Sequence, residues 1–407
     1  MSKLEELIDE LCPNGVEYRT INSISERIVS GGTPKTSNRL YYGGEIPWLR
    51  TQEINFCDIY ETSIYITEKG FQNSSVKWIP ENCVIVAMYG ATVGKVAINK
   101  IPLTTNQACC NIQLDSEIAS YKYVFYCLSS QYEYIKSLGQ GSQTNINSQI
   151  VKNLKIPVPP RPIQDEIVRI LDNFTKLTDE LIAELTTELT AREKQYEYYR
   201  DKMLACDKKI PMVKLKDIAT DIYRGTGIKR DQVTSDGIPC VRYGEIYTTY
   251  NIWFDKCVSH TQIEYVSAPK YFEHGDILFA ITGESIEDIA KSVAYVGNER
   301  CLAGGDIVVM KHKQNPKYLA YVLSTYEARW QKSKGRIKSK VVHSNVPSIE
   351  NIEVPLPSLE VQERFVNVLD NFDSVCSELK IGLHDEIELR KKQYEFYRDA
   401  LLTFAET

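Results

Sequence analysis

The sequence predicts an α+β protein in which one structural unit occurs twice, each copy being a mixed α/β module followed by a long helix. Three observations support this fold class: an internal repeat with an offset of 198 residues, a helical period inside the repeat, and short β-rich runs outside it. The 407 residues suffice for two to four domains at about 150 residues each. We therefore expect the order module, helix, module, helix.

The repeat is clearest in two segments of 52 residues. Residues 153–204 and 351–402 align without a gap and are identical at 22 positions, including LDNF and the string KQYE. Such a match indicates a tandem duplication. We divide the chain into a first module (1–155), a first helical segment (156–205), a second module (206–352) and a second helical segment (353–407).

Each helical segment carries a stripe of apolar and aromatic residues. The spacing between them is three or four residues and averages about 3.6, the period of an α-helix. A helix from about Ile163 to Leu204 would be about 63 Å long. We expect the two long helices to pack on each other as an antiparallel, coiled-coil-like spacer that separates the modules. The alternative is that each helix packs only on its own module.

Both modules contain short β-rich runs and one predicted helix. The runs are Cys83–Tyr89, Ala108–Leu114, Ile277–Ile281 and Ile307–Met310, and the helices are expected near Ser120–Ser137 and Pro316–Lys334. Strands dispersed among few helices favour α+β over a doubly wound sheet. The modules match more loosely than the helices: GEIPWLR at 44–50 corresponds to DGIPCVR at 236–242.

Composition excludes several classes of protein. Hydrophobic residues make up 43% and charged residues 25%, as in ordered globular proteins. Apolar stretches are far shorter than the roughly 20 residues of a membrane span, and the N-terminus lacks a secretory signal, so we expect a cytoplasmic protein without membrane contact. The eleven cysteines are then thiols, and no Cys-x-x-Cys pair or histidine cluster predicts a metal site. We find no catalytic constellation either.

The net charge of −6 is unevenly distributed. The two modules carry −1 and +4, whereas the two helical segments carry −3 and −6. Affinity for phosphate depends on local patches rather than on total charge. The basic second module is therefore compatible with nucleic-acid binding.

Two loops that follow the predicted module helices are candidate DNA contacts. In module two, residues 329–340 contain six basic residues and no acid. Basic groups suit phosphate and guanine, whereas asparagine and glutamine pair with adenine. The alternatives are a solvated lysine-rich helix end in module two and an ordinary turn in module one. The candidate residues are Lys332, Lys334, Arg336, Lys338, Lys340, His343 and Asn345 in module two and Ser142, Gln143, Thr144, Asn145 and Asn147 in module one.

A second pair of loops ranks lower. It contains Lys35 and Thr36 after a Gly-Gly-Thr-Pro string in module one, and Lys229 and Arg230 at the corresponding place in module two. These loops could equally be simple connections.

The glycine-rich stretch from Gly90 to Lys95 lacks the Ser/Thr of a P-loop, so a turn between strands is the better interpretation.

The duplicated layout resembles the specificity subunit of type I restriction–modification enzymes. The supporting strings are LCPNGVEY at 11–18, SGGTP at 30–34, GEIPW at 44–48, IPVPP at 156–160 with Gln164, and VPLP at 354–357 with Gln362. The resemblance covers essentially the whole chain. Module two departs from it, because RGTG at 224–227 replaces the Gly-Gly-Thr-Pro string and Cys240 stands where Trp48 does.

The resemblance implies two target-recognition domains, each recognising one half of a split, asymmetric site in double-stranded DNA. It also implies that two modification subunits bind the helical spacers and methylate adenine with S-adenosylmethionine. Restriction subunits would add ATP- and Mg-dependent translocation and cleavage, so no cofactor is expected in this non-catalytic chain. The alternatives are a tandem protein-binding scaffold without DNA recognition, and a self-contained modification or cleavage enzyme.

Overall fold

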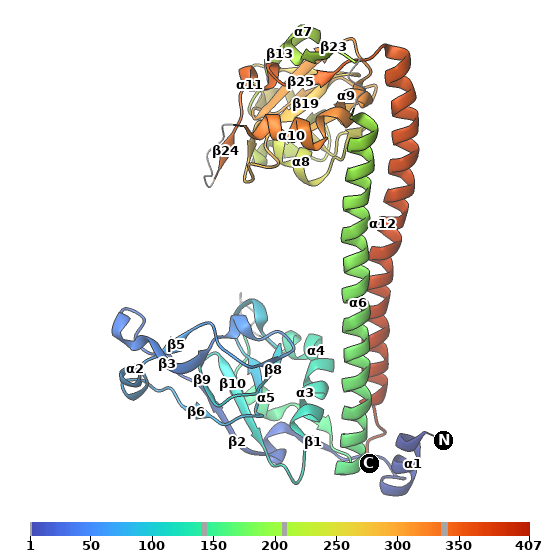
Figure 1. Ribbon diagram of the computed structural model, residues 1–407. Coiled ribbons are helices and arrows are strands. Elements are labelled where there is room, and N and C mark those ends of the chain that lie inside the picture. Colours follow the sequence, from blue (N-terminus) through green and yellow to red (C-terminus); the bar gives the residue numbers. More distant parts are fainter. Residues whose placement is uncertain (1, 140–144, 206–209, 335–340) are drawn as a thin grey trace. The chain divides into compact units, whose positions relative to one another are not determined.

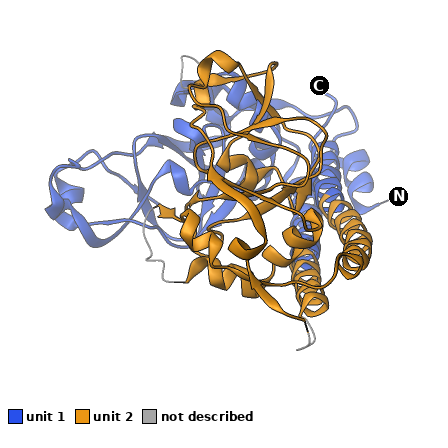
Figure 2. Cartoon of the chain, turned by 90° about the horizontal axis from the view of Figure 1, so that it is seen from above, with its two compact units in different colours: residues 1–185, 385–407 blue, residues 186–384 orange. Residues whose placement is uncertain are grey.

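The computed structural model describes residues 2–139, 145–205, 210–334 and 341–407, which form two compact units (Figures 1 and 2). Unit 1 comprises residues 1–185 and 385–407, and unit 2 comprises residues 186–384. The two long helices, α6 (Arg161–Leu204) and α12 (Leu359–Leu401), cross from one unit into the other. Each unit therefore contains one module and parts of both long helices.

The module of unit 1 is built on two sheets and a two-stranded ribbon. The strand orders are β2-β10-β7-β8-β4 and β5-β3-β9-β6, and β1 pairs with β11. The strands are β1 (Tyr18–Thr20), β2 (Ser25–Ser30), β3 (Tyr42–Leu49), β4 (Cys57–Ile59), β5 (Tyr65–Ile66), β6 (Trp78–Ile79), β7 (Val84–Ala87), β8 (Val96–Asn99), β9 (Leu103–Thr105), β10 (Cys109–Leu114) and β11 (Lys155–Pro157).

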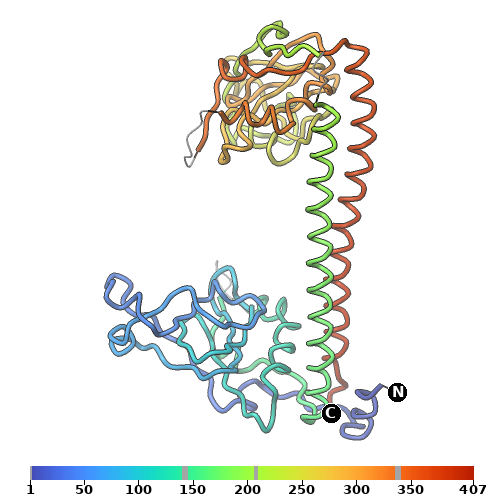
Figure 3. The backbone as a smooth tube through the Cα atoms, in the orientation of Figure 1, coloured from blue at the N-terminus to red at the C-terminus, as the bar shows by residue number. Residues whose placement is uncertain are grey.

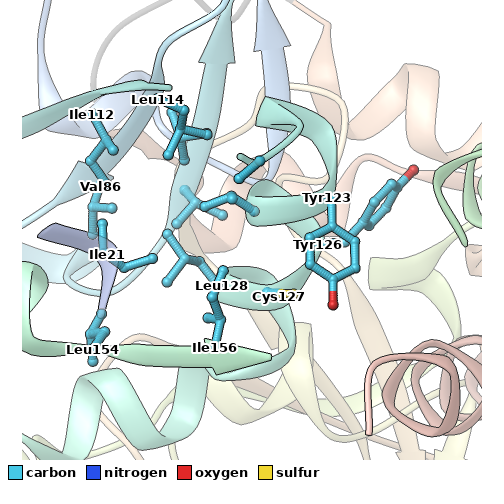
Figure 4. Close-up of a cluster of buried hydrophobic side chains, with 14 of the residues drawn as sticks. Ile21, Val86, Ile112, Leu114, Tyr123, Tyr126, Cys127, Leu128, Leu154 and Ile156 are labelled. Carbon is cyan, nitrogen blue, oxygen red and sulfur yellow. The ribbon is translucent and has the colours of Figure 1, made fainter. Parts of the chain in front are cut away.

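Short helices pack on both sheets of unit 1. They are α1 (Lys3–Leu11), α2 (Glu68–Gln72), α3 (Tyr121–Ser130), α4 (Tyr132–Ser137) and α5 (Ser148–Asn153). Helices α3 and α5 lie on the larger sheet, and α2 lies beside β3 of the smaller sheet. Apolar side chains of β7 and β10, such as Val86 and Ile112, pack with Leu128 of α3 in the main core (Figure 4). Ile163 and Ile167 of α6 join the same core, so the beginning of α6 is part of the module's fold.

Unit 2 repeats this architecture. Both of its sheets have five strands, in the orders β13-β23-β19-β21-β16 and β14-β17-β15-β22-β18. Two ribbons pair β12 with β25 and β20 with β24. The strands are β12 (Met212–Lys214), β13 (Ala219–Arg224), β14 (Val233–Thr234), β15 (Ile238–Val241), β16 (Trp253–Phe254), β17 (Ser259–Thr261), β18 (Tyr271–Phe272), β19 (Ile277–Ala280), β20 (Thr282–Gly283), β21 (Ser292–Tyr295), β22 (Cys301–Ala303), β23 (Ile307–His312), β24 (Val342–His343) and β25 (Glu353–Pro355).

The helices of unit 2 also correspond to those of unit 1, with one difference from the prediction. They are α7 (Leu215–Ile218), α8 (Tyr243–Thr248), α9 (Pro316–Leu323), α10 (Tyr326–Ser333) and α11 (Val346–Glu350). The expected strands are confirmed, but the single helix predicted for each module is two consecutive helices, α3–α4 and α9–α10. In unit 2 the Thr325 hydroxyl accepts a hydrogen bond from the Ala328 amide and starts a new helix.

An aspartate joins each module to the helix that follows it. Asp172 of α6 accepts hydrogen bonds from the Lys122 ammonium and the Tyr126 hydroxyl, both on α3. In unit 2, Asp370 of α12 accepts from Lys317 and Tyr321 of α9 in the same way. Both aspartates belong to the repeated LDNF string. The repeat is therefore explained in part by a joint that occurs once in each unit.

Stacked aromatic side chains hold the two long helices together within each unit. In unit 2, the Phe372 ring of α12 lies 5.3 Å from the Tyr196 ring of α6, centroid to centroid. In unit 1, the Phe174 ring lies 5.7 Å from Tyr394, the position that corresponds to Tyr196. Within unit 2, Glu193 pairs with Lys380, so residue numbers increase in opposite directions along the pair. The predicted antiparallel packing is confirmed within each unit.

Each module contacts the start of one long helix and the end of the other. Leu402, just after α12, is buried in the main core of unit 1, and Leu204 of α6 is buried in the core of unit 2. The N-terminal and C-terminal segments also meet in unit 1, where Val16 bridges Glu406 (Figure 3). Packing between helices and packing on the module, which we treated as alternatives, thus occur together.

Candidate nucleic-acid interface

In unit 1 the two candidate loops, one with Lys35 and one with Asn145, lead to the same end of the five-stranded sheet. Ser30, the last residue of β2, pairs with Cys110, and Ala87, the last residue of β7, pairs with Cys109. The loop with Lys35 leaves β2 at this end. The loop with Asn145 returns to it, because the Ile146 amide donates a 3.0 Å hydrogen bond to the Met88 carbonyl just after β7.

Unit 2 has the same arrangement. Arg224 at the end of β13 pairs with Val308, and Ala280 at the end of β19 pairs with Ile307. The Ser344 amide donates a 2.8 Å hydrogen bond to the Ile281 carbonyl, as Ile146 does to Met88. We call these two places the sheet ends of units 1 and 2.

The first loops leave the sheet along the same backbone path despite their different sequences. A Cβ atom on Gly31 would lie 2.1 Å from the Thr105 carbonyl oxygen, and one on Gly225 would lie 2.2 Å from the Gly304 carbonyl oxygen. Only glycine avoids these clashes. Lys35 and Lys229 each lie four residues after the corresponding glycine and are exposed. Lys229 directly precedes a 3₁₀ turn, whereas Lys35 lies four residues before one.

A buried tryptophan and a half-buried tyrosine anchor the first loop of unit 1. The Trp48 indole donates a 3.0 Å hydrogen bond to the Gly32 carbonyl, and the Tyr42 hydroxyl donates one of 2.7 Å to the Pro34 carbonyl. Lys35 and Thr36 come directly after this anchor and are exposed. The loop therefore presents them from a fixed base.

The asparagines of the second loops have a local structural role as well. Asn147 caps α5 by accepting a 3.0 Å hydrogen bond from the Ile150 amide, and Asn345 caps α11 by accepting one of 2.9 Å from the Ser348 amide. Both residues are exposed, and the capping bond uses only the amide oxygen of each side chain. Asn145 is half-buried and accepts from the Gly90 amide. Ser142, Gln143 and Thr144 lie outside the described residues.

The structure corrects the prediction for Lys332. Its side chain is only 5% exposed, and its ammonium donates to the Ser292 hydroxyl and the Leu323 carbonyl inside unit 2. Lys332 is therefore part of the interior rather than of an exposed basic loop. Lys334, two residues further and directly after α10, is exposed, and its ammonium lies 4.9 Å from the centre of the Trp330 ring. Arg336, Lys338 and Lys340 lie outside the described residues.

The other predicted residues of unit 2 are exposed. His343 lies beside β20, where its Nδ1 atom is 3.2 Å from the Thr282 hydroxyl. Lys229 and Arg230 stand at the start of a short 3₁₀ turn. Of the predicted residues in unit 2 that the structure describes, all except Lys332 are thus exposed on the surface.

Two residues at the sheet ends were not among the predicted contacts. Tyr89 follows β7, is 41% exposed and precedes Gly90, which bonds Asn145. Arg224 ends β13 and pairs with Asp306 at 2.6 Å. The sequence gives no clear signal for the exposure of Tyr89, because other tyrosines of this chain, such as Tyr123 and Tyr295, are fully buried.

Other kinds of site find no support in the described part of the chain. Within it, no group of three or more His, Cys, Asp or Glu side chains is placed to hold a metal ion. No helix among these residues is long and apolar enough to cross a membrane. Residues 90–92 form a 3₁₀ turn between β7 and β8, as expected for a turn rather than a phosphate-binding loop.

Two modules of one fold, with different exposed side chains at equivalent sheet ends and long helices that repeat one sequence pattern, define a tandem recognition protein. Comparison with known proteins identifies its family: residues 13–191 and 208–389 both match the type I restriction modification DNA specificity domain. The chain belongs to this family and is a specificity subunit rather than a catalytic subunit.

Individual relatives agree with this assignment. A putative type I restriction enzyme specificity subunit of Haemophilus influenzae is 26% identical over 99% of this chain and 98% of its own length. The specificity subunit of EcoR124I/EcoR124II from Escherichia coli is 29% identical over 70% of each chain. The HsdS subunit from Thermoanaerobacter tengcongensis shares the fold, with a TM-score of 0.52 at 18% identity over 96% of this chain and 97% of that chain.

A chain from a structure on assembly and conformational transition of the type I restriction–modification system is more similar in fold. Its TM-score is 0.70 at 18% identity, over 96% of this chain and 98% of that chain.

Proposed function

We propose that each sheet end recognises one half of a split, asymmetric site in double-stranded DNA. The observation that carries this proposal is that two equivalent sheet ends present different side chains. Both ends offer a lysine (Lys35 or Lys229) and a capping asparagine (Asn147 or Asn345). Unit 1 adds Thr36 and Asn145, whereas unit 2 adds Arg230 and His343. Different donors and acceptors in equivalent places would select different base pairs.

The basic residues would supply most of the affinity. Lysine and arginine neutralise phosphates at either sheet end, and this term does not depend on sequence. Asparagine side chains whose oxygen is held by a helix cap keep two N–H donors for acceptors on base edges. Recognition would then combine phosphate contacts from the first loops with base contacts from the second loops.

We further propose that the exposed faces of the long helices bind two modification subunits. Large apolar side chains remain exposed at repeated positions: Leu177 and Val375, Tyr198 and Phe396, and Tyr199 and Tyr397. Exposed apolar residues in a repeated pattern are typical of partner interfaces. Since the pattern occurs twice, two copies of one partner could bind equivalently.

In this proposal the chemistry belongs to the partners. The modification subunits would methylate adenine with S-adenosylmethionine after flipping the base into their own pockets. Restriction subunits would add translocation and cleavage with ATP and Mg²⁺. The specificity subunit would decide where these reactions occur.

The test is methylome sequencing of cells that express this chain with its neighbouring modification subunit. We expect a split motif methylated on adenine. Exchanging residues 206–352 for the second module of a relative should change one half of the motif and leave the other half unchanged. No new methylation with an active partner would instead favour a tandem scaffold that binds only proteins.

A further inference from the structure

A cavity of about 150 Å³ inside unit 2 has a strongly basic wall. The cationic side chains on this wall are Arg200 of α6, Lys291 before β21, and Arg329 and Lys332 of α10. Asp288 is the carboxylate among the lining residues. Arg200 pairs with Asp201 at 2.6 Å and Arg329 with Glu197 at 3.0 Å, whereas Lys291 donates to the backbone carbonyls of Tyr247 and Tyr250. Lys291 and Lys332 thus donate to uncharged acceptors, and an anion in the cavity would lower the repulsion among the cations.

Lys332 is the most deeply placed of these cations. It donates 3.0 Å and 2.8 Å hydrogen bonds to the Ser292 hydroxyl and the Leu323 carbonyl. The two acceptors match the two N–H donors of a neutral amine. A charged ammonium has three donors, so one of them would lack an acceptor. Burial, and to a smaller extent the neighbouring Arg329 charge, lower the pKa of Lys332 to about 7.

Arg329 and Ser292 have donors that the interior does not use. Arg329 donates through one terminal nitrogen to Glu197 at 3.0 Å, but its Nε–H group is buried and has no hydrogen-bond partner among the described residues. Ser292 accepts a hydrogen bond from Lys332, so its own hydroxyl hydrogen remains available. A buried donor without a partner costs about 1–3 kcal/mol, which an acceptor in the cavity would recover.

We propose that this cavity binds a small oxyanion of the phosphate class between Arg329, Lys332 and Ser292. The oxyanion would accept from the Arg329 Nε–H group, from the Ser292 hydroxyl and from the third donor of a protonated Lys332. Its negative charge would also offset the repulsion among the cations. The site lies beside β21 and α10. Helix α10 ends at Ser333, directly before the basic sequence of residues 334–340.

Unit 1 provides an internal comparison. Arg398 occupies the position that corresponds to Arg200 and lines a cavity of its own. Glu395 and Asp399 on that wall correspond to Glu197 and Asp201 of unit 2, but the wall also carries the carboxylates of Glu133 and Asp179. Asp179 corresponds to the uncharged Ser377. An oxyanion is therefore expected in unit 2 only.

The proposal is tested on the full chain by titrating inorganic phosphate against chloride at equal ionic strength and pH 7. We expect saturable heat of binding and a rise of about 5 °C in the melting temperature of unit 2 at saturating phosphate. Lys332→Met and Ser292→Ala should both abolish the response. Lys216→Gln removes an exposed cation of α7 from the same unit, away from the cavity and from the sheet end, and should leave the response unchanged.

Lys332 gives a second readout that does not depend on stability. Bound phosphate should protect its amine from an acylating reagent, measured by peptide mass spectrometry, while Lys334 stays reactive. If phosphate raised the melting temperature of the wild-type chain and of both cavity variants equally, the proposal would be overturned. A response to a short DNA duplex but not to free phosphate would also overturn it, and would assign the basic wall to a backbone phosphate.

Discussion

The Tyr126 hydroxyl donates a 2.8 Å hydrogen bond to Asp172, and this one contact links a module helix to a helix that continues into the other unit. Tyr321 makes a bond of the same length to Asp370 in unit 2. Both joints combine a charge-assisted hydrogen bond with a lysine–aspartate pair, which makes them stronger than ordinary surface contacts. They explain why the aspartate of the LDNF string occurs in both copies.

We predict that Asp172→Ala weakens this joint by about 1–3 kcal/mol, because Lys122 and Tyr126 lose a shared acceptor. Hydrogen exchange of α3 measures the effect as a lower free energy of local opening. Asp165→Ala removes an exposed carboxylate of α6 that pairs only with Arg161 and should leave α3 unchanged. Equal exchange in the two variants would contradict a specific role of the joint.

The fold was predictable where the sequence repeats a periodic pattern. The long helices follow from a 3.6-residue period kept in two copies, and the central strands follow from short apolar runs bounded by turn residues. The break between α9 and α10 was missed because Thr325 was treated as part of a continuous helix. The Thr325 hydroxyl accepts a hydrogen bond from the Ala328 amide, but a threonine inside an apolar run does not by itself indicate a new helix start.

The sequence did not show which residues of the candidate loops are exposed. Lys332 and Lys334 belong to one basic run, and composition does not show which of them faces inward. The helix phase gives the answer, because Lys332 lies four residues after the buried Ala328 and therefore on the same face. The match of Lys35 with Lys229 was obscured by an offset of 194 residues instead of 198. The close approach at Gly31 and Gly225 restores it.

We predict that Lys35→Ala and Lys229→Ala weaken DNA binding in different ways, depending on what each residue contacts. A phosphate contact should lower affinity for all sequences and reduce the salt slope by about 1. A base contact should relax preference in one half-site at a cost of about 1–3 kcal/mol. Lys216→Ala removes an exposed lysine of α7, which precedes β13 and so lies away from the sheet end. Salt-dependent binding of all three variants equal to that of the wild type would remove these loops from the interface.

Lys332 should make the stability of unit 2 depend on pH. Its pKa is lowered to about 7 in the folded chain and is about 10.4 when unfolded, so the unfolded state binds one more proton between these values. The free energy of unfolding should therefore rise with pH from about 7 to 10, by at most about 1.4 kcal/mol per pH unit. Urea unfolding in chloride buffer should show this slope, and Lys332→Met should lack it. Lys334→Met, an exposed control, should keep it.

His312 is expected to cause acid instability. Burial lowers its pKa to about 4, and its Nδ1 atom accepts a hydrogen bond from the Gln314 amide, so the folded state holds the neutral ring. Because the unfolded state protonates near pH 6.5, stability should fall as pH decreases from about 6.5 to 4. His312→Asn should flatten this part of the pH profile in urea unfolding. The same change at the exposed His384 should not, and if it did, general charge rather than His312 would be responsible.

The long helices give the last prediction, which concerns the gap between the half-sites. Seven residues added to both α6 and α12 at the boundary between the units, near Thr186 and His384, would lengthen each helix by about 10.5 Å and keep its stripe in phase. If the helices set the gap, methylome sequencing should show a spacer longer by about three base pairs at 3.4 Å each, with both half-sites unchanged. The same insertion in α6 alone breaks the register of pairs such as Phe372 with Tyr196 and should reduce methylation instead. Altered half-site sequences in the double insertion would contradict the idea that the helices act only as a spacer.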